Sequence, residues 1–179
     1  MNKKILVISS SPRKGGNSDT LCDMFIKGAA ESGHQAEKLR LSELKINYCS
    51  ACYTCKKIGH CVKQDDMEQI ISKMRKADVI VLSTPVYFYS MSAQLKTMID
   101  RTLGGAQQPG LENKAFYMIA TAADSKSEIE RTVDAMRGYL KCLPGAKEMG
   151  VIYGSGAWQL GDIRNNPAMQ EAYEMGKTI

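Results

Sequence analysis

The chain has 179 residues, of which 44% are hydrophobic and 24% are charged, a balance typical of one soluble globular domain. No stretch contains the roughly 18 apolar residues that a membrane helix needs. The net charge of +5 is mild, and no lysine and arginine block interleaved with aromatics indicates nucleic-acid binding. We therefore expect one domain over residues 1–179 without a membrane or nucleic-acid partner. The first apolar run, Ile5–Ile8, is too short for a secretory signal, which favours a cytoplasmic location.

Strand patterns and helix patterns alternate along the chain, which predicts an α/β fold with a parallel sheet. We expect strands over 4–9, 36–41, 78–83, 115–121 and 148–153. Helical periodicity predicts helices over 18–32, from Asp65 onward, around Leu95–Thr102, from Ser127 onward and from Pro167 onward. A capping box at Asp65 and Glu68 is expected to begin the second of these helices, and Ser127 is expected to cap the fourth. This order suits a flavodoxin-like, doubly wound, three-layer α/β/α fold with strand order 2-1-3-4-5.

The turn between the first strand and the first helix, residues 9–18, is crowded with hydroxyls, glycines and one arginine. A phosphate suits such a turn, because free N–H groups, the helix dipole and short donors converge at a helix N-terminus. Gly15 and Gly16 permit positive φ, and Asn17 or Ser18 is a suitable N-cap. The alternative is an ordinary turn, since serine, glycine and asparagine are common there. The motifs G-x-x-x-x-G-K-S/T and G-x-G-x-x-G are both missing, so we expect a mononucleotide such as FMN.

A second segment, Thr84–Ser90, is apolar and aromatic where a surface loop is usually polar. A flat heteroaromatic ring such as isoalloxazine would give Tyr87, Phe88 and Tyr89 a partner. These aromatics would otherwise close the end of the core or pack at a subunit contact. Ligands of a flavodoxin-like sheet bind outside the carboxyl ends of its strands, so residues 9–18, 84–90 and 121–124 are expected to surround one site.

Four of the six cysteines form the pattern C-x2-C-x2-C-x5-C, made by Cys49, Cys52, Cys55 and Cys61. The first three follow the spacing of a bacterial ferredoxin run, whereas structural zinc usually takes two pairs separated by a dozen residues or more. The spacing therefore favours a 4Fe–4S cluster over zinc, with four free thiols as the other alternative. Nearby lysines 56, 57 and 63 are placed to offset the negative charge of a cluster. We treat residues of about 45–64 as a cysteine-rich insertion.

These motifs resemble a known family. The segment Ser11-Pro12-Arg13-x-x-Gly16-Asn17-Ser18 resembles the phosphate loop of the NADPH-dependent FMN reductase superfamily. The segments Thr84-Pro85-Val86-Tyr87-Phe88 and Ala93-x-Leu95-Lys96-x-x-Ile99-Asp100-Arg101 are similar to its second flavin loop and the helix that follows. The cysteine run followed by Asp65-Asp66-Met67 is similar to the iron–sulfur flavoprotein branch.

The resemblance implies a role for each matching residue. It implies an FMN phosphate site at Ser11, Arg13, Asn17 and Ser18, a ring site at Pro85, Val86, Tyr87 and Phe88, and cluster ligands at Cys49, Cys52, Cys55 and Cys61. The candidate cofactor-binding set also includes Ser9, Gly16, Thr121 and Ala122. A homodimer or homotetramer is implied as well.

We expect a flavin-dependent oxidoreductase that moves electrons from NAD(P)H or a ferredoxin to a small-molecule or protein acceptor. No catalytic side chain is expected, because the flavin carries the chemistry; Asp124 is interpreted as a helix cap. The alternatives are an NAD(P)H-dependent FMN or quinone reductase without a cluster, a non-enzymatic flavin electron carrier, and a flavin-free scaffold with a zinc-stabilised loop.

Overall fold

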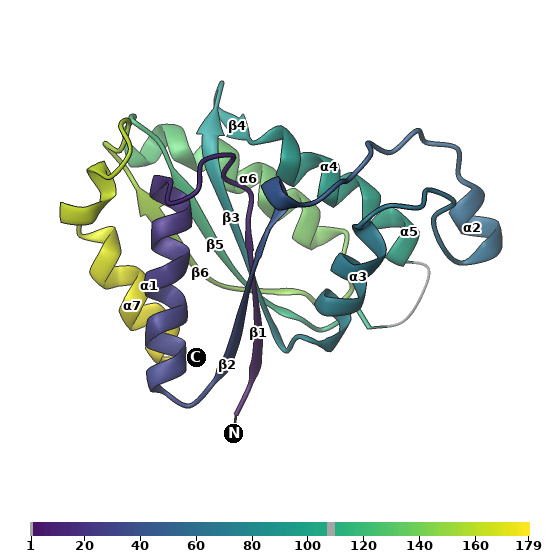
Figure 1. Ribbon diagram of the computed structural model, residues 1–179, viewed down its shortest axis with the longest axis horizontal. Coiled ribbons are helices and arrows are strands. Elements are labelled where there is room, and N and C mark those ends of the chain that lie inside the picture. The colour runs from purple at the N-terminus through teal and green to yellow at the C-terminus, as the bar shows by residue number, and fades with distance from the viewer. Residues whose placement is uncertain (1, 107–109) are drawn as a thin grey trace.

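A computed structural model describes residues 2–106 and 110–179, and a central twisted sheet forms its middle layer (Figure 1). Its strands are β1 (Lys4–Ser9), β2 (Gln35–Arg40), β3 (Val79–Tyr87), β4 (Ser90–Met91), β5 (Ala115–Thr121) and β6 (Lys147–Gly154). The five long strands are parallel in the order β2-β1-β3-β5-β6, and the short β4 pairs antiparallel with β3. Counted without β4, this is the predicted order 2-1-3-4-5, which confirms the flavodoxin-like fold. The predicted loop position Pro109 lies outside the described residues.

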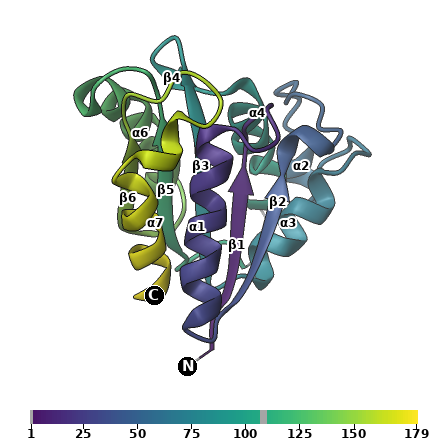
Figure 2. The same cartoon turned by 60° about the vertical axis from the view of Figure 1, so that its left-hand side comes forward.

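Helices cover both faces of the sheet. They are α1 (Asn17–Glu31), α2 (Thr54–Ile58), α3 (Met67–Lys76), α4 (Ala93–Arg101), α5 (Leu103–Ala106), α6 (Lys126–Lys141) and α7 (Ala168–Lys177), with short 3-10 turns at Leu41–Glu43 and Asp162–Asn165. Helices α1 and α7 lie on one face, and α3, α4 and α6 lie on the other (Figures 1 and 2). The cysteine segment and α2 project beyond the edge of the sheet (Figure 1).

Strand β1 shows why the sheet is buried on both faces. Its apolar residues alternate, so that Ile5 and Val7 pack under α1 and α7 while Leu6 and Ile8 pack under α3 and α4. All four are at most 2% exposed. A continuous apolar run of this kind is what a central parallel strand requires, and the predicted bounds 4–9 are confirmed.

The predicted helix caps at Asn17 or Ser18, Asp65 and Ser127 are wrong, as is the interpretation of Asp124 as a cap. For Asn17 and Asp65 the reason is a tertiary contact that takes the side chain. Gly16, and not Asn17 or Ser18, is the N-cap of α1, since the Asn17 side chain bonds a distant loop. Asp65 forms no capping box with Glu68, because its carboxylate binds Arg101. Ser125 occupies the N-cap position of α6 in place of Ser127.

Helices α1 and α7 cross at two glycines. A Cβ added to Gly28 would overlap the carbonyl oxygen of Tyr173, and one added to Gly176 would overlap that of Phe25. The two backbones therefore approach more closely than any side chain would permit, and both glycines hold the C-terminal helix on the sheet.

We expect Gly176→Ala to lower the free energy of unfolding by about 2 kcal/mol, because the new methyl group forces the two helices apart. The matched control is Gly138→Ala in α6, where an added Cβ meets nothing within 4 Å. That change should raise stability by about 0.5–1 kcal/mol, since alanine is the better helix former. Urea unfolding of the two variants measures both effects, and equal changes would contradict the close crossing.

Candidate functional site

A cleft of about 420 Å³ opens at the carboxyl ends of β1, β3 and β5. It brings together the three predicted loops and adds a fourth, the segment after β6. Every predicted cofactor-binding residue except Ser9 lines the cleft, namely Ser11, Arg13, Gly16, Asn17, Ser18, Pro85, Val86, Tyr87, Phe88, Thr121 and Ala122. The further lining residues are Tyr89, Ala123, Asp124, Ala157, Trp158 and Leu160.

The first loop is folded tightly on itself. The Arg13 N–H donates to Ser11 Oγ at 3.2 Å, and the Ser11 hydroxyl in turn donates to the Arg13 carbonyl at 3.0 Å. The Gly16 N–H also donates to this carbonyl, at 3.1 Å. A Cβ on Gly16 would lie only 2.6 Å from Ser11 Oγ, so this position of the cradle admits no side chain.

Ser18 supplies a hydroxyl that the protein leaves unpaired. The residue is 1% exposed, lines the cleft, and its Oγ has no hydrogen-bond partner among the described residues. It lies in the first turn of α1, where backbone N–H groups have no intrahelical acceptor. A buried orphan hydroxyl costs free energy unless a ligand satisfies it. These donors fit an anion such as a phosphate group.

Asn17 joins the first loop to the segment after β6. Its Nδ2 donates to the Gln159 carbonyl at 2.9 Å, and its Oδ1 accepts from the N–H groups of Gly161 and Ile163 at 3.2 and 3.4 Å. This contact brings the exposed Trp158 and Leu160 to the rim of the cleft. Sequence reasoning missed both residues. The feature that could have identified them is a pair of large apolar side chains in a glycine-rich loop at the carboxyl end of the last strand.

Ser9 lies below the loop instead of facing the cleft. Its hydroxyl donates to Asp19 Oδ1 at 2.7 Å, and Asp19 Oδ2 accepts the Gly15 N–H at 3.0 Å. Asp19 is only 2% exposed and was not predicted to matter. Ser9 therefore contributes to the shape of the loop through a buried carboxylate.

The aromatic segment is a hairpin and not a loop. Strand β3 continues past the predicted end at Ser83 to Tyr87, because β4 pairs with its last residues. Phe88 and Tyr89 form the tip with φ of 50° and 58°, the left-handed region that a two-residue type I′ turn requires. Bulky residues rarely adopt it, and such strain gathers at functional sites. Among the described residues, Phe88 is fully exposed, so its ring face is open to a ligand or another subunit.

Buried hydroxyls fix the hairpin to the floor of the cleft. The Ser10 hydroxyl donates to the Ser83 carbonyl at 2.8 Å and accepts from the Ser92 hydroxyl at 2.8 Å. The Thr84 hydroxyl accepts the Ser92 N–H at 2.9 Å. Ser92 also caps α4, so the ends of β1 and β3 and the start of α4 form one rigid base.

The four cysteines border one small hollow beside α5, of about 20 Å³. That is room for about one water molecule, and no group of three or more histidine, cysteine or acidic side chains in residues 2–106 and 110–179 is placed to hold a metal ion. In this conformation the loop does not fit a cubane cluster. Two of the three lysines predicted to offset cluster charge lie over tyrosine rings of the same segment: Lys56 lies over the Tyr53 ring at 4.7 Å and Lys63 over the Tyr48 ring at 5.0 Å.

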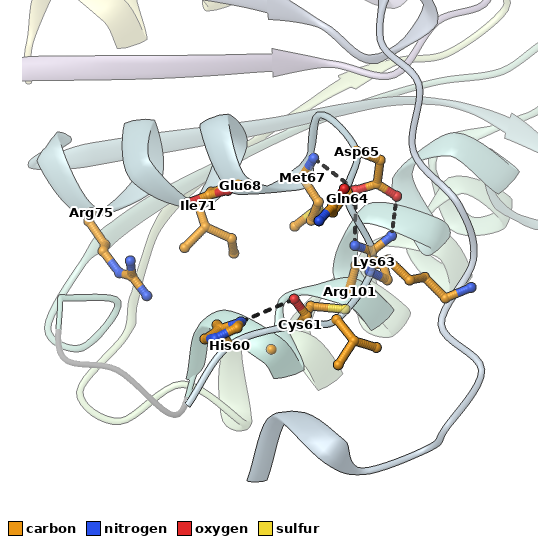
Figure 3. A pocket seen from close by; sticks show the side chains of 12 residues that line it. His60, Cys61, Lys63, Gln64, Asp65, Met67, Glu68, Ile71, Arg75 and Arg101 are labelled. Atoms are coloured by element: carbon orange, nitrogen blue, oxygen red, sulfur yellow. Dashed lines mark hydrogen bonds and ion pairs between the residues drawn. The ribbon is translucent and has the colours of Figure 1, made fainter. Parts of the chain in front are cut away.

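A buried ion pair closes the base of the cysteine segment, at the edge of a cavity of about 530 Å³ (Figure 3). Arg101 of α4 donates two hydrogen bonds to Asp65, at 2.6 and 2.9 Å, and one to the Asn47 carbonyl at 2.6 Å. Burial opposes ionisation of Asp65, but hydrogen bonds from Arg101, Asn47 and Met67 outweigh it and hold the pKa of this carboxyl far below its ordinary value. Arg101 thus ties both ends of the segment to the helix that follows the aromatic hairpin.

The sheet order and the cleft at its carboxyl edge define a flavodoxin-like scaffold with a ligand site at the switch point of the sheet. The NADPH-dependent FMN reductase family profile matches residues 3–157, and the chain belongs to that family. It is by class a flavin-dependent oxidoreductase. No helix in the described part of the chain is long and apolar enough to cross a membrane.

Similar proteins include iron-sulfur flavoproteins of archaea. One from Methanocaldococcus jannaschii is 32% identical, with 98% of this chain and 95% of that protein covered. One from Archaeoglobus fulgidus is 40% identical, but the match covers 62% of this chain and only 50% of that protein. Among solved structures, an NAD(P)H:quinone oxidoreductase from Methanothermobacter marburgensis has a TM-score of 0.76 at 16% identity, with 99% of this chain and 97% of that one covered, which shows the shared fold.

Proposed function

We propose that the cleft binds FMN and that the protein transfers electrons from NAD(P)H to an acceptor. The observation that carries this proposal is the unpaired, buried Ser18 hydroxyl at the first turn of α1, in the same cleft as the exposed aromatic hairpin. The cleft offers anion donors from the first loop, and apolar and aromatic surface from the hairpin and the segment after β6, which matches a phosphorylated isoalloxazine. The family match supports the same conclusion.

In this proposal the bound FMN supplies the hydride or electron transfer, and the chain supplies position. Ser18 and Arg13 hold the phosphate, while Pro85, Val86 and the hairpin tip cover the ring. Arg13 and Asp124 are the only charged side chains among the described residues that line the cleft. Asp124 is exposed, and no side chain is assigned to acid–base chemistry.

The test is an anaerobic purification followed by FMN titration and steady-state turnover. We expect flavin absorbance, retention of added FMN, and oxidation of NADH or NADPH with a quinone or free FMN as acceptor. A colourless, folded protein that does not retain FMN would contradict the proposal. FMN binding without NAD(P)H turnover, but with rapid reduction by a ferredoxin, would identify a carrier instead.

A second candidate is an FMN protein that also carries a 4Fe–4S cluster on the cysteine segment. Two observations favour it: all four cysteines border the same hollow, and the relatives named above are iron-sulfur flavoproteins. The hollow is too small as it stands, so the segment would have to open on loading. Iron and acid-labile sulfide of about four each per chain, lost together in a Cys55→Ser variant, would support the cluster; zinc, or no metal after anaerobic reconstitution, would exclude it.

We further propose a homodimer or homotetramer and a cytoplasmic location. Support for assembly comes from Phe88, Trp158 and Leu160, which are exposed apolar side chains gathered at one rim of the cleft. Patches of this kind mark ligand or subunit contacts. Light scattering of the Phe88→Ser variant against the native protein tests the assembly: loss of the oligomer supports it, and a monomeric native protein contradicts it.

A further inference from the structure

A buried carboxylate lies directly beneath the first loop of the cleft. Asp19 is the third residue of α1, and its two oxygens accept the Ser9 hydroxyl at 2.7 Å and the Gly15 N–H at 3.0 Å. These bonds hold Gly15, whose φ of 67° forms the bend of the loop. The carboxylate therefore shapes the cradle, but it also places a negative charge under a site proposed for phosphate.

Two cations of β2 reach this carboxylate from the side opposite the cleft. Arg40 donates from Nη1 to Asp19 Oδ2, and Lys38 Nζ lies 3.4 Å from Asp19 Oδ1. The Arg40 and Lys38 side chains are only 10% and 22% exposed. Neither residue lines the cleft, so neither contacts a ligand there directly, and their nearest charged neighbour on the cleft side is Asp19.

The same cations also pair with acids at the surface. Arg40 contacts Glu43, and Lys38 contacts Asp23, but these two carboxylates are 61% and 59% exposed. Water and salt screen exposed charges far more than buried ones. The charge balance at the loop therefore depends mainly on the buried Asp19 and the two partly buried cations that contact it.

Asp19 carries its negative charge near neutral pH. Burial opposes its ionisation, but hydrogen bonds from Ser9 and Gly15, together with Lys38 and Arg40, lower the pKa of the carboxyl below its ordinary value. Without the cations, the hydrogen bonds from Ser9 and Gly15 would still favour the ionised carboxyl, and a phosphate group above the loop would meet its negative charge. At separations of several ångströms near a protein surface, such repulsion amounts to one or more kcal/mol.

We propose that Arg40 and Lys38 act as positioning residues that neutralise Asp19 and so give the cleft its preference for phosphorylated FMN over unphosphorylated riboflavin. The inference rests on the proposed function, namely that FMN occupies the cleft. The isoalloxazine and ribityl groups are common to both ligands, so only the phosphate senses the charge under the loop. The ratio of the two dissociation constants is therefore the quantity that Arg40 and Lys38 control.

The experiment measures FMN and riboflavin affinities by fluorescence quenching for the full chain and four variants. We expect Arg40→Gln to weaken FMN binding about tenfold while riboflavin binding changes less than twofold. Arg40→Lys, which keeps the charge, should retain most of the preference. Lys73→Gln removes an equal charge beside β2, where Lys73 contacts the exposed Glu37, and should leave both affinities unchanged.

The fourth variant, Asp19→Asn with Arg40→Gln, separates electrostatics from loop structure. If Arg40 acts by neutralising Asp19, the double variant should recover much of the FMN preference that Arg40→Gln loses. Equal weakening of FMN and riboflavin by Arg40→Gln, or the same loss in Lys73→Gln, would overturn the inference. Should Arg40→Gln fail to fold, Lys38→Gln tests the same point. A native protein that binds neither flavin would instead refute the proposed function.

Discussion

Replacing Arg101 with methionine is expected to lower the free energy of unfolding by about 3–5 kcal/mol, because removing one partner of a buried ion pair leaves a buried charge uncompensated. The side chains of Arg101 and Asp65 are only 1% and 3% exposed. Without Arg101, Asp65 keeps N–H donors from Asn47 and Met67 but no cation. Urea unfolding gives the free-energy difference directly.

The control lies on the same helix. Lys96 and Asp100 form an exposed pair, with side chains 57% and 44% exposed. Lys96→Met should therefore change stability by less than about 0.5 kcal/mol. The double variant Arg101→Met with Asp65→Asn should regain a large part of the loss, because no buried charge is left without a partner. Similar destabilisation by Lys96→Met and Arg101→Met would contradict the stabilising role of the buried Arg101–Asp65 ion pair.

The buried ion pair of Arg101 and Asp65 also predicts how stability depends on pH. The pKa of Asp65 is lowered in the folded state from an ordinary value of 3.8. A lowered carboxyl pKa contributes stability that is present above the unfolded pKa and is lost as the pH falls toward the folded value. The stability difference between the native protein and Asp65→Asn should therefore be constant above about pH 5 and shrink below about pH 4. A difference that grows on acidification would refute this assignment.

The elements with strong periodicity were predictable from the chain alone. The bounds of β1 and β5 match the predicted ranges, since both are continuous apolar runs between polar segments. In the helix predicted from Asp65 onward, Met67, Ile70, Ile71 and Met74 recur at helical spacing, and all four are buried. Strand β3 was predicted too short, because Thr84–Tyr87 contains a proline and its pairing partners, first β5 and then β4, are not indicated by the local pattern.

The site was predictable where neighbours in sequence are neighbours in space. The loop of residues 9–18 and the aromatic hairpin meet at the cleft because parallel strands end on one edge. The contacts of Asn17 and Arg40 could not be predicted in this way, because their partners are distant in the sequence. Asn17 bonds Gln159, 142 positions away, and Arg40 reaches Asp19 across two elements. An acid near a helix start looks like a favourable dipole contact, and only the packed structure shows that Asp19 supports the loop.

The cysteine segment shows the limit of spacing as evidence. Cys49, Cys52, Cys55 and Cys61 border one hollow, but their role as cluster ligands stays a prediction. Metal binding, however, depends on sulfur positions to within a few tenths of an ångström. Those positions are set by the backbone of the loop, in which Ala51 and Tyr53 both adopt positive φ. The spacing of the cysteines in the sequence does not determine the φ angle of either residue.

Replacing Arg13 with alanine is expected to weaken FMN binding by roughly 30- to 100-fold, the loss of about 2–3 kcal/mol that accompanies removal of a charge-assisted, forked contact to phosphate. Arg13 is the only cation among the described lining residues of the cleft. The neighbouring Lys14 is exposed and does not line it. Lys14→Ala removes the same charge one residue away, and its FMN dissociation constant should stay within about twofold of the native value, because Lys14 does not line the cleft and its charge reaches the ligand only through solvent.

Riboflavin distinguishes the phosphate contact from a general loss of the cleft. The Arg13 guanidinium has no phosphate to bind in that ligand, so Arg13→Ala should leave riboflavin affinity nearly unchanged. Side-chain truncation also leaves the loop intact, since the Arg13 N–H and carbonyl, and not its side chain, form the bonds to Ser11 and Gly16. Unchanged FMN affinity in Arg13→Ala would place the phosphate elsewhere. Equal losses for FMN and riboflavin would mean that Arg13 supports the ring pocket and not the anion cradle.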